Sequence, residues 1–435
     1  MDLKNKTVLV IGIGNSGFNA CLLLHDLGAS VKATDASSGP SVISNAKKLE
    51  DKGIDVETGG HTEGFIAGSD LVVISPGVED SSPALKWAKS NRIPIMGEME
   101  LGSRFCKGKI IGITGTNGKS TVTTLIGEIL KDAGLDTVVC GNIGNSLCGE
   151  IPRIKNDTWV VLEVSSFQLE TINSFKPYIA LILNITDDHM DRYSKFDEYF
   201  KEKVKIFANQ DERDILILNY DAKNLRSLKD KASSKVYFYS KSDKANGSYD
   251  IKIRGLHNLE NVLASVLVGR LAGVKEESMK RTIAAFKGLK HRIELVDTVD
   301  EVEYIDDSKG TTVDSTYRAL EACDRPMILI AGGKDKHSDY AYVKDIVRKK
   351  VKDLILIGEA AGAIKKALKG SVAMHEARDM FEAVSMAHGL AKKGWSVILS
   401  PMCSSFDMFK DYKERGDVFR KAVGSLKKSS QPIRV

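Results

Sequence analysis

The stretch KIIGITGTNGKST, residues 109–121, joins an apolar run to a glycine-rich turn that ends in Gly-Lys-Ser-Thr. The run predicts a buried strand, and the turn predicts the start of a helix. Backbone amides of such a turn cradle phosphates, Lys119 can reach the terminal phosphates, and the Ser120 hydroxyl can bind Mg²⁺. Ile113 stands where the strict phosphate-loop pattern has its first glycine. The strand–loop–helix context still predicts a turn that binds ATP.

A second glycine turn, GIGNSG at residues 12–17, follows an apolar run near the start of the chain. It matches the GxGxxG pattern, and Asp35 ends the next strand, where an acid that binds a ribose is expected. The helix that follows the turn attracts a phosphate at its N-terminus. The pattern therefore predicts a nucleotide-type ligand, without distinguishing NAD from another diphosphate. A tight turn that binds no ligand is the alternative interpretation.

Apolar runs rich in β-branched residues alternate with helical patterns along the rest of the chain. This alternation predicts an α/β fold, with parallel sheets covered by helices. It restarts near Pro94 and near residues 287–290, so we expect three domains, at 1–94, 95–288 and 289–435. The expected strands are 7–13, 31–34, 71–74, 109–114, 159–164, 179–185, 215–219, 327–331, 354–357 and 397–399, and the expected helices include 315–322, 340–347 and 380–391.

The composition is that of an ordinary globular protein. The 435 residues correspond to roughly three domains at about 150 residues each. Lysine and arginine number 63 and aspartate and glutamate 58, and this near balance argues against a dedicated nucleic-acid binder. The six cysteines form no CxxC pair, which predicts reduced thiols. With no membrane-length apolar run and no signal peptide, we expect a cytoplasmic protein without a membrane partner.

Polar side chains close several of the predicted strands, at the edge where parallel sheets bind ligands. Glu163 ends an apolar run and suits a second contact to magnesium, although a solvated strand-end carboxylate is equally compatible with the local pattern. His189 lies in a crowded polar segment, NITDDHMD, after another run. The segments at 306–312, 331–336 and 400–405 offer small residues with cations or hydroxyls. Each of these three segments predicts an anion site or a simple turn.

The order of the motifs is more informative than any one of them. GTNGKST, LEVSSFQLE, NITDDHMDRY, KHRIE, DDSKGTT and SPMCSSFDMFKDYKERG together resemble the Mur ligase family of peptidoglycan precursor enzymes, and the resemblance covers essentially the whole chain. It implies an ATP-dependent amide ligase with an N-terminal Rossmann-like domain, a central phosphate-loop domain with a mostly parallel sheet, and a C-terminal Rossmann-like domain. The last motif resembles that of the member that adds D-glutamate to UDP-N-acetylmuramoyl-L-alanine.

The resemblance also implies three sets of contact residues. The UDP-linked substrate is expected at Gly14, Asn15, Ser16, Asp35, Ser75, Gly77, Asn142 and Gln168. ATP is expected at Gly115, Thr116, Asn117, Gly118, Lys119, Ser120, Thr121, Asn258, Asn261, Arg292 and Asp307. D-Glutamate is expected at Lys309, Thr311, Lys336, Ser405 and Tyr412.

Two Mg²⁺ ions are implied as well. Ser120 and Glu163 would bind the first ion, and His189 the second, together with a carbamylated lysine that matches Lys203. Lys203 lies on a helical stretch expected over 196–208, and Lys205, on the same stretch, is the less favoured candidate for the modified residue. Lys119, His189 and Lys203 are the implied catalytic residues, in a chain expected to be monomeric.

Three other interpretations remain open from the residues alone. A folylpolyglutamate-synthetase-like or another Mur-type ligase has a related phosphate loop, although a nucleotide domain before the loop argues against the former. The GxGxxG turn with Asp35 is compatible with an NAD-dependent dehydrogenase that carries an ATPase domain, but no convincing His–Asp pair for hydride transfer is found. A non-catalytic nucleotide sensor would leave the charged strand ends without a purpose.

Overall fold

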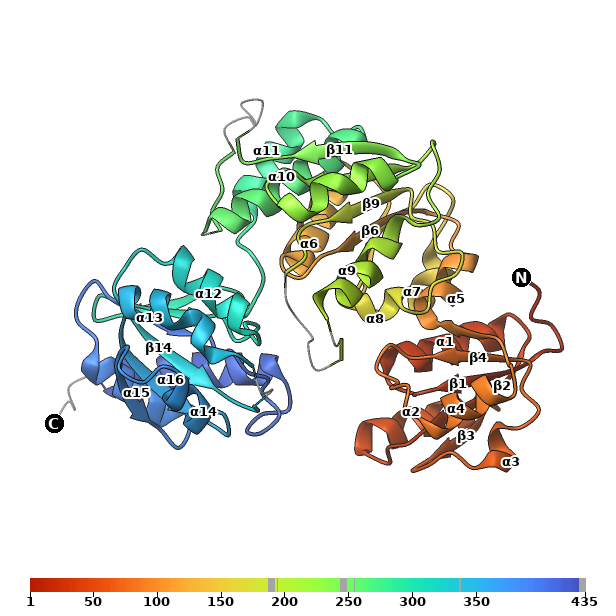
Figure 1. Ribbon diagram of the computed structural model, residues 1–435, viewed down its shortest axis with the longest axis horizontal. Coiled ribbons are helices and arrows are strands. Elements are labelled where there is room, and N and C mark those ends of the chain that lie inside the picture. Colours follow the sequence, from red (N-terminus) through yellow and green to blue (C-terminus); the bar gives the residue numbers. More distant parts are fainter. Residues whose placement is uncertain (187–191, 194, 243–248, 254, 336–337, 430–435) are drawn as a thin grey trace. The chain divides into compact units, whose positions relative to one another are not determined.

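The computed structural model describes residues 1–186, 192–193, 195–242, 249–253, 255–335 and 338–429. The chain forms two compact units. One unit contains Met1–Tyr249 and Glu260–Ile283, and the other contains Asp250–Leu259 and Ala284–Val435. Three sheets follow one another along the chain, the first drawn in red and orange, the second from orange to green and the third from cyan to blue (Figure 1).

The first sheet is parallel, with the strand order β3-β2-β1-β4-β5. Alternate residues of its central strand enter two different cores: Val8 and Val10 face one, and Leu9 and Ile11 face the other. The sheet is therefore covered by helices on both faces. Its elements are β1 (Thr7–Ile11), α1 (Asn15–Asp26), β2 (Ser30–Asp35), α2 (Pro40–Glu50), β3 (Asp55–Thr58), α3 (Glu63–Ile66), β4 (Leu71–Ile74), α4 (Pro83–Ser90), β5 (Ile95–Gly97) and α5 (Glu98–Phe105).

The second sheet is also parallel, with the order β11-β10-β9-β6-β8-β7. Strand β6 lies in its interior between β9 and β8, so the loop after β6 leaves from the middle of the sheet edge. The elements are β6 (Lys109–Thr114), α6 (Lys119–Asp132), β7 (Thr137–Gly141), α7 (Leu147–Glu150), a 3₁₀ turn (Ile151–Arg153), β8 (Trp159–Glu163), α8 (Ser166–Leu169), β9 (Ile179–Ile182), α9 (Phe196–Val204), a 3₁₀ turn (Lys205–Phe207), β10 (Ile215–Asn219), a 3₁₀ helix (Lys223–Lys231), β11 (Lys235–Tyr239), α10 (Leu256–Leu271) and α11 (Glu276–Ala285).

The third sheet has the order β12-β13-β17-β14-β15-β16, and β12 runs antiparallel to β13. This edge strand was not among the expected strands and departs from the expected parallel pairing, and a two-residue turn joins it to β13. The other pairs are parallel. The elements are β12 (Glu294–Val299), β13 (Val302–Asp306), α12 (Val313–Ala322), β14 (Met327–Gly332), a 3₁₀ turn (Tyr340–Val343), α13 (Lys344–Lys350), β15 (Val351–Ile357), α14 (Ala361–Ala367), β16 (Ala373–Glu376), α15 (Met380–Leu390), β17 (Ser396–Leu399) and α16 (Tyr412–Ser429).

Three strands are shorter than expected: β8 ends at Glu163, one residue early, and β1 and β9 end early for reasons that bear on the site. β1 ends at Ile11 rather than at residue 13, because Gly12 adopts φ +85° and turns the chain out of the sheet. β9 ends at Ile182 rather than at residue 185. Beyond it the backbone continues beside the phosphate loop, where Leu183 N donates to Thr114 O (3.0 Å) and Thr116 N to Asn184 O (2.9 Å).

Within the first unit, α1 and α5 pack against α7. Two glycines allow this close approach. A Cβ at Gly102 would lie 2.8 Å from Leu147 Cγ, and one at Gly149 would lie 2.9 Å from Asn19 Cγ. Asn19 Nδ2, on α1, donates to Asn145 Oδ1 (2.8 Å). The helix that follows the first glycine turn is thereby fixed to the loop before α7.

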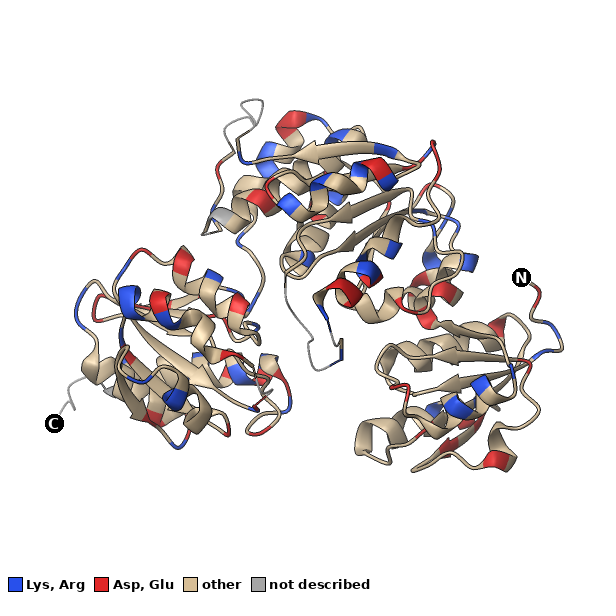
Figure 2. Ribbon diagram, in the orientation of Figure 1, with Lys and Arg blue, Asp and Glu red and all other residues tan. Residues whose placement is uncertain are grey.

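Basic and acidic residues are interspersed along all three parts of the ribbon (Figure 2). Among the described residues, no helix is both long enough and apolar enough to cross a membrane. The six cysteines are free thiols, as predicted.

Candidate active site

The phosphate loop between β6 and α6 depends on two glycines. Gly115 has φ +152° and Gly118 has φ +87°, a region that residues with a Cβ rarely adopt. A Cβ at Gly118 would also lie 2.4 Å from Asn261 Oδ1, on α10. Asn261 is therefore packed against the loop, as expected for a residue of the predicted ATP set.

Side-chain hydrogen bonds tie the loop to the segment after β9. Asn184 Oδ1 accepts from Asn117 N (2.8 Å), and Asn184 Nδ2 donates to Asn117 O (3.1 Å). The Thr116 hydroxyl donates to Thr186 O (3.1 Å) and accepts from Thr186 N (3.0 Å). The loop is thus held in shape by the chain after β9, and the N-terminus of α6 at this loop is a site of the kind that attracts phosphates.

Lys119 and Lys203 both bind the carbonyl oxygen of Gly115, at 2.8 Å and 3.0 Å from their Nζ atoms. Lys119 Nζ donates to Thr116 O as well (2.9 Å). Lys203, on α9, is only 1% exposed, and its Nζ lies 4.7 Å from the centre of the Tyr199 ring. The structure therefore brings these two predicted catalytic lysines to one loop. The third, His189, lies outside the described residues.

Glu163 ends β8, the neighbour of β6, and is 2% exposed. Its Oε1 accepts from Asn142 Nδ2 (3.0 Å), whereas its Oε2 is buried and makes no hydrogen bond to any described residue. A buried carboxylate oxygen without a partner is costly unless a cation or a proton binds it. Since Mg²⁺ prefers carboxylate and hydroxyl oxygens, Glu163 and the buried Ser120 at the start of α6 fit the predicted magnesium site. Thr121, next to Ser120, is also buried.

The first glycine turn leads from β1 into α1, whose N-cap is Gly14. A Cβ at Gly17 would lie 1.8 Å from Gly12 O, so only glycine fits at position 17. Ser75 Oγ donates to the same carbonyl (2.8 Å), and Asp35 Oδ2 accepts from Ile13 N (2.8 Å). Gly14, Asn15 and Ser16 therefore lie in the turn itself, with Asn15 exposed and Ser16 half-buried, and Asp35 and Ser75 hydrogen-bond to it. The other predicted positions lie elsewhere: Gly77 is exposed after β4, Asn142 follows β7, and Gln168 is on α8.

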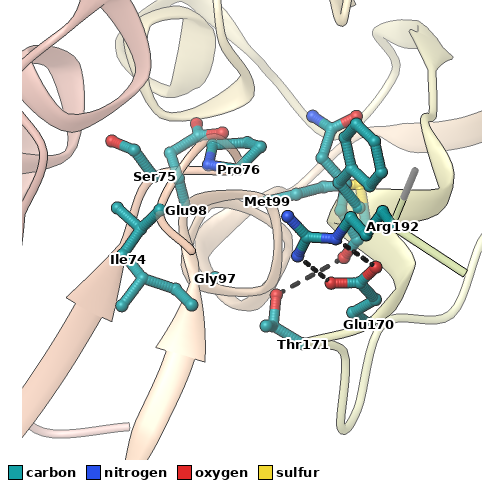
Figure 3. A pocket seen from close by; sticks show the side chains of 12 residues that line it. Ile74, Ser75, Pro76, Gly97, Glu98, Met99, Glu170, Thr171 and Arg192 are labelled. Atoms are coloured by element: carbon teal, nitrogen blue, oxygen red, sulfur yellow. Dashed lines mark hydrogen bonds and ion pairs between the residues drawn. The ribbon is translucent and has the colours of Figure 1, made fainter. Parts of the chain in front are cut away.

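A narrow pocket lies between the loop after β4 and the segment from α8 to Arg192 (Figure 3). Two residues of the predicted UDP set, Ser75 and Gln168, line it together. Gln168 Oε1 accepts from Ser165 N (2.9 Å). This hydrogen bond is part of the capping box of α8, and it fixes the Gln168 side chain. Arg192 pairs with Glu170 (2.5 Å) at the other side of the pocket.

Glu98, the first residue of α5, lines the same pocket and was not singled out from the sequence. It is 1% exposed, its Oε1 accepts from Cys148 N (2.7 Å), and its buried Oε2 has no hydrogen-bond partner among the described residues. Burial raises the pKa of this carboxyl, and the bond from Cys148 opposes that shift. No local pattern marks Glu98, because its burial results from the packing of α5 against α7.

Of the predicted D-glutamate residues, Lys309 and Thr311 lie on the loop after β13, Ser405 lies on the loop after β17, and Tyr412 begins α16. Lys309 Nζ lies 5.7 Å from the centre of the Tyr412 ring, at the start of α16. Lys309 O accepts from Thr311 N (2.8 Å), and Ser405 is 2% exposed. Met402 N donates to Gly310 O (3.0 Å) and joins the two loops. The fifth predicted residue, Lys336, lies outside the described residues.

The remaining predicted ATP residues, Asn258, Arg292 and Asp307, belong to the second unit. Asp307 is buried, and its Oδ2 accepts from Ser400 Oγ (2.7 Å). Burial raises the pKa of this carboxyl to about 7, although the hydrogen bond from Ser400 and the charge of the nearby Arg292 both act to lower the pKa. His291 Nδ1 pairs with Asp306 Oδ2 at 2.7 Å, and this contact raises the pKa of the imidazole.

Three family models match the chain in order. The Mur ligase MurD-like N-terminal domain matches residues 6–97, the Mur ligase middle domain 113–269, and the Mur ligase glutamate ligase domain 291–403. The chain belongs to the Mur ligase family. The family predicted from the motifs is thus confirmed, and the dehydrogenase and sensor interpretations fall away. Mur ligases use ATP and Mg²⁺.

Relatives named UDP-N-acetylmuramoylalanine–D-glutamate ligase match this family member from end to end. That of Koribacter versatilis is 41% identical, with 98% of this chain and 99% of the relative covered. That of Caldanaerobacter subterraneus is 42% identical, with 98% and 100% covered. Among solved structures, the UDP-N-acetylmuramate–alanine ligase of Thermotoga maritima has a TM-score of 0.64 at 17% identity, with 98% of this chain and 100% of that chain covered. This likeness confirms the mixed α/β architecture with three Mur-ligase-like domains.

Proposed function

We propose that this Mur ligase joins D-glutamate to UDP-N-acetylmuramoyl-L-alanine, with ATP converted to ADP and phosphate. The observation that carries the proposal is the end-to-end match to glutamate-adding relatives at 41–42% identity. The preformed phosphate loop with Lys119, beside the unpartnered oxygen of Glu163, is the site that this reaction requires.

The chemistry follows from the weakness of a carboxylate as an electrophile. A carboxylate oxygen of the alanyl group attacks the γ-phosphorus of ATP, the bond to the bridging oxygen breaks, and ADP leaves. The product is an acyl phosphate. The neutral amine of D-glutamate then attacks the acyl carbon, the C–O bond to phosphate breaks, and the amine loses a proton. Lys119 neutralises charge on the transferring phosphoryl group, and the rigid loop orients it.

Ser120 and Glu163 hold one Mg²⁺ ion, and His189 and Lys203 hold a second. Bound Mg²⁺ neutralises phosphate charge and polarises the phosphoryl oxygens. Gly115, Thr116, Asn117, Gly118 and Thr121 form the phosphate cradle. Asn258, Asn261, Arg292 and Asp307 contact the rest of ATP.

Lys203 carries a carbamate in the active enzyme. Addition of CO₂ to the neutral amine, with loss of a proton, turns a cation into an anionic oxygen ligand suited to Mg²⁺. Burial supports this assignment because it disfavours the ammonium form, and Lys203 is 1% exposed. The alternative candidate, Lys205, has a side chain that is 40% exposed and pairs with Glu202. A buried lysine that only fixes Gly115 is the competing explanation.

A rescue experiment separates the two roles of Lys203. If it carries a carbamate, Lys203→Ala loses most of its activity, and acetate partly restores it by supplying the missing carboxylate oxygens. Lys205→Ala is the matched control and keeps its activity. Full activity of Lys203→Ala, or an inactive but folded variant that no small carboxylate rescues, would contradict the carbamate.

The three substrates are assigned to three domains. A Rossmann-like domain at 1–94 binds the UDP-linked substrate through Gly14, Asn15, Ser16, Asp35, Ser75 and Gly77, with Asn142 and Gln168 added from the central domain. The central domain spans 95–288. A Rossmann-like domain at 289–435 binds D-glutamate through Lys309, Thr311, Lys336, Ser405 and Tyr412. The enzyme works as a cytoplasmic monomer.

The test is ADP release with ATP, UDP-N-acetylmuramoyl-L-alanine and D-glutamate, with each substrate omitted in turn. Full release requires all three, and L-glutamate does not replace the D-isomer. Undiminished release without D-glutamate, or release that depends on another amino acid instead, would contradict the proposed function.

A further inference from the structure

Arg415 is the largest fully buried side chain among the described residues. It lies in the first turn of α16, and its relative exposure is 0%. Burial of an arginine is costly unless its donors are satisfied, since the guanidinium carries five N–H groups and a permanent charge. A position of this kind requires an explanation, and the proposed reaction does not use the residue.

The guanidinium donates four hydrogen bonds. Nε binds Ser308 Oγ (2.9 Å), and one terminal nitrogen binds Ser308 O (2.8 Å). The other terminal nitrogen binds Cys403 O (3.1 Å) and Ser404 O (3.2 Å). One planar group therefore spans two loops, the loop after β13 and the loop after β17.

The same network reaches the start of α16 and the loop after β14. Ser308 Oγ, which accepts from Arg415, donates to Tyr412 O (2.7 Å). Ser404 O also accepts from Lys334 N (2.9 Å). A Cβ at Gly333 would lie 3.1 Å from the guanidinium, so only glycine allows this strand end to approach so closely. Four segments thus meet at Arg415.

All four hydrogen bonds go to neutral oxygens, three carbonyls and a hydroxyl. Burial lowers the pKa of Arg415 to about 10, so the group remains charged at neutral pH. Asp407, Asp306 and Asp307 are near enough to attract the guanidinium, but none of them hydrogen-bonds it, so its desolvation is only partly offset and stability alone is a poor explanation for its burial. Its geometry is specific instead: a lysine at this position has three donors on one atom and cannot bridge both loops in the same way.

Four residues of the proposed D-glutamate set are carried by the segments that Arg415 joins. Lys309 and Thr311 follow Ser308, Ser405 follows Ser404, and Tyr412 provides the carbonyl that Ser308 binds. We propose that Arg415 is a positioning residue for the amino-acid substrate. Arg415 sets the separation of the loop after β13 from the loop after β17, and it thereby shapes the pocket for the dicarboxylate. This inference rests on the proposed function for the identity of the substrate.

The test compares Arg415→Lys and Ser308→Ala with Arg420→Lys. Arg420 lies on the same helix and pairs with Glu294 on β12, so it controls for loss of a guanidinium from α16. We expect Arg415→Lys and Ser308→Ala to raise the KM for D-glutamate at least about tenfold, with the KM for ATP changed less than about threefold. Ser308→Ala removes the shared hydroxyl with little change in volume, and it keeps the test available if Arg415→Lys folds poorly.

Hydrogen exchange provides a readout that does not depend on activity. Amides in 308–311 and 402–405 should exchange faster in both variants than in wild type and Arg420→Lys. An unchanged KM for D-glutamate, an equal rise in both KM values, or unchanged exchange in these loops would overturn the positioning role. If wild type releases no ADP with D-glutamate, the proposed function fails, and the exchange experiment still decides whether Arg415 holds the loops.

Discussion

Replacing Lys119 with alanine separates the chemical role of this lysine from its structural one. Lys119 Nζ donates two hydrogen bonds to the backbone of its own loop, at 2.8 Å and 2.9 Å. Hydrogen bonds from a charged donor contribute about 1.5–3 kcal/mol each in favourable settings, and exposure reduces this for a half-buried residue. We therefore expect Lys119→Ala to lower the free energy of unfolding by only about 1–3 kcal/mol.

The effect on the reaction should be larger. In the proposed phosphoryl transfer Lys119 would face developing negative charge, and removal of one preorganised donor of this kind costs about 100- to 1,000-fold in kcat, or roughly 3–4 kcal/mol. The assay is ADP release at saturating substrates, with denaturant unfolding measured on the same sample. Lys131→Ala is the matched control, because Lys131 is exposed in the last turn of the same helix. A folded Lys119→Ala variant with kcat within tenfold of wild type would refute the assignment of the loop to ATP.

Four further predictions concern other parts of the site. Glu163→Gln should require a higher Mg²⁺ concentration for half-maximal ADP release without loss of stability, because Oε2 has no hydrogen bond to lose; an unchanged Mg²⁺ dependence would contradict this. Gly17→Ala should lower the free energy of unfolding by about 1–3 kcal/mol, since its Cβ would overlap Gly12 O, whereas Gly14→Ala, with open space at its Cβ, should change it by less than about 1 kcal/mol. The pKa of His291 is raised, so its pairing with Asp306 stabilises the fold fully below pH 6.5, and this contribution is lost as the pH rises through the raised pKa. His291→Asn should therefore lower the free energy of unfolding more at pH 6 than at pH 9, as measured by urea unfolding. The pKa of Glu98 is raised, so ionisation of its carboxyl disfavours the folded state. Glu98→Gln should therefore have a higher free energy of unfolding than wild type between pH 5 and pH 8. A lower free energy of unfolding over that range would count against a buried charge.

The parts of the fold that depend on local pattern were predictable. Continuous apolar runs such as Lys109–Thr114 and Leu71–Ile74 are strands at the expected residues, because both faces of a parallel sheet are buried. Several strands were missed, β3, β5, β7, β11, β12, β13 and β16. In the antiparallel strand Glu294–Val299 the two apolar residues Leu295 and Val296 are followed by Asp297 and Thr298, so no continuous apolar run marks it. The ends of β1 and β9 were misplaced where the chain leaves the sheet, at the Gly12 turn and beside the loop between β6 and α6.

The site divides in the same way. The glycine turns and Lys119 are adjacent in sequence, so their spacing alone indicated a phosphate site. Glu98 and Arg415 could not be found in this way, because what distinguishes them is burial against segments distant in sequence. Arg415 lies in the segment KERG, residues 413–416, yet nothing in those four residues indicates that its guanidinium spans two loops.

The central claim, that ATP activates the substrate carboxylate for attack by D-glutamate, is tested most directly by an isotope. The enzyme is incubated with ATP, D-glutamate and UDP-N-acetylmuramoyl-L-alanine in which both carboxylate oxygens are ¹⁸O. The masses of the products are then measured by mass spectrometry. The acyl phosphate route predicts one ¹⁸O in the released phosphate and one in the new amide. Amide product formed together with phosphate that lacks ¹⁸O, or with the second label in ADP or in water, would contradict it.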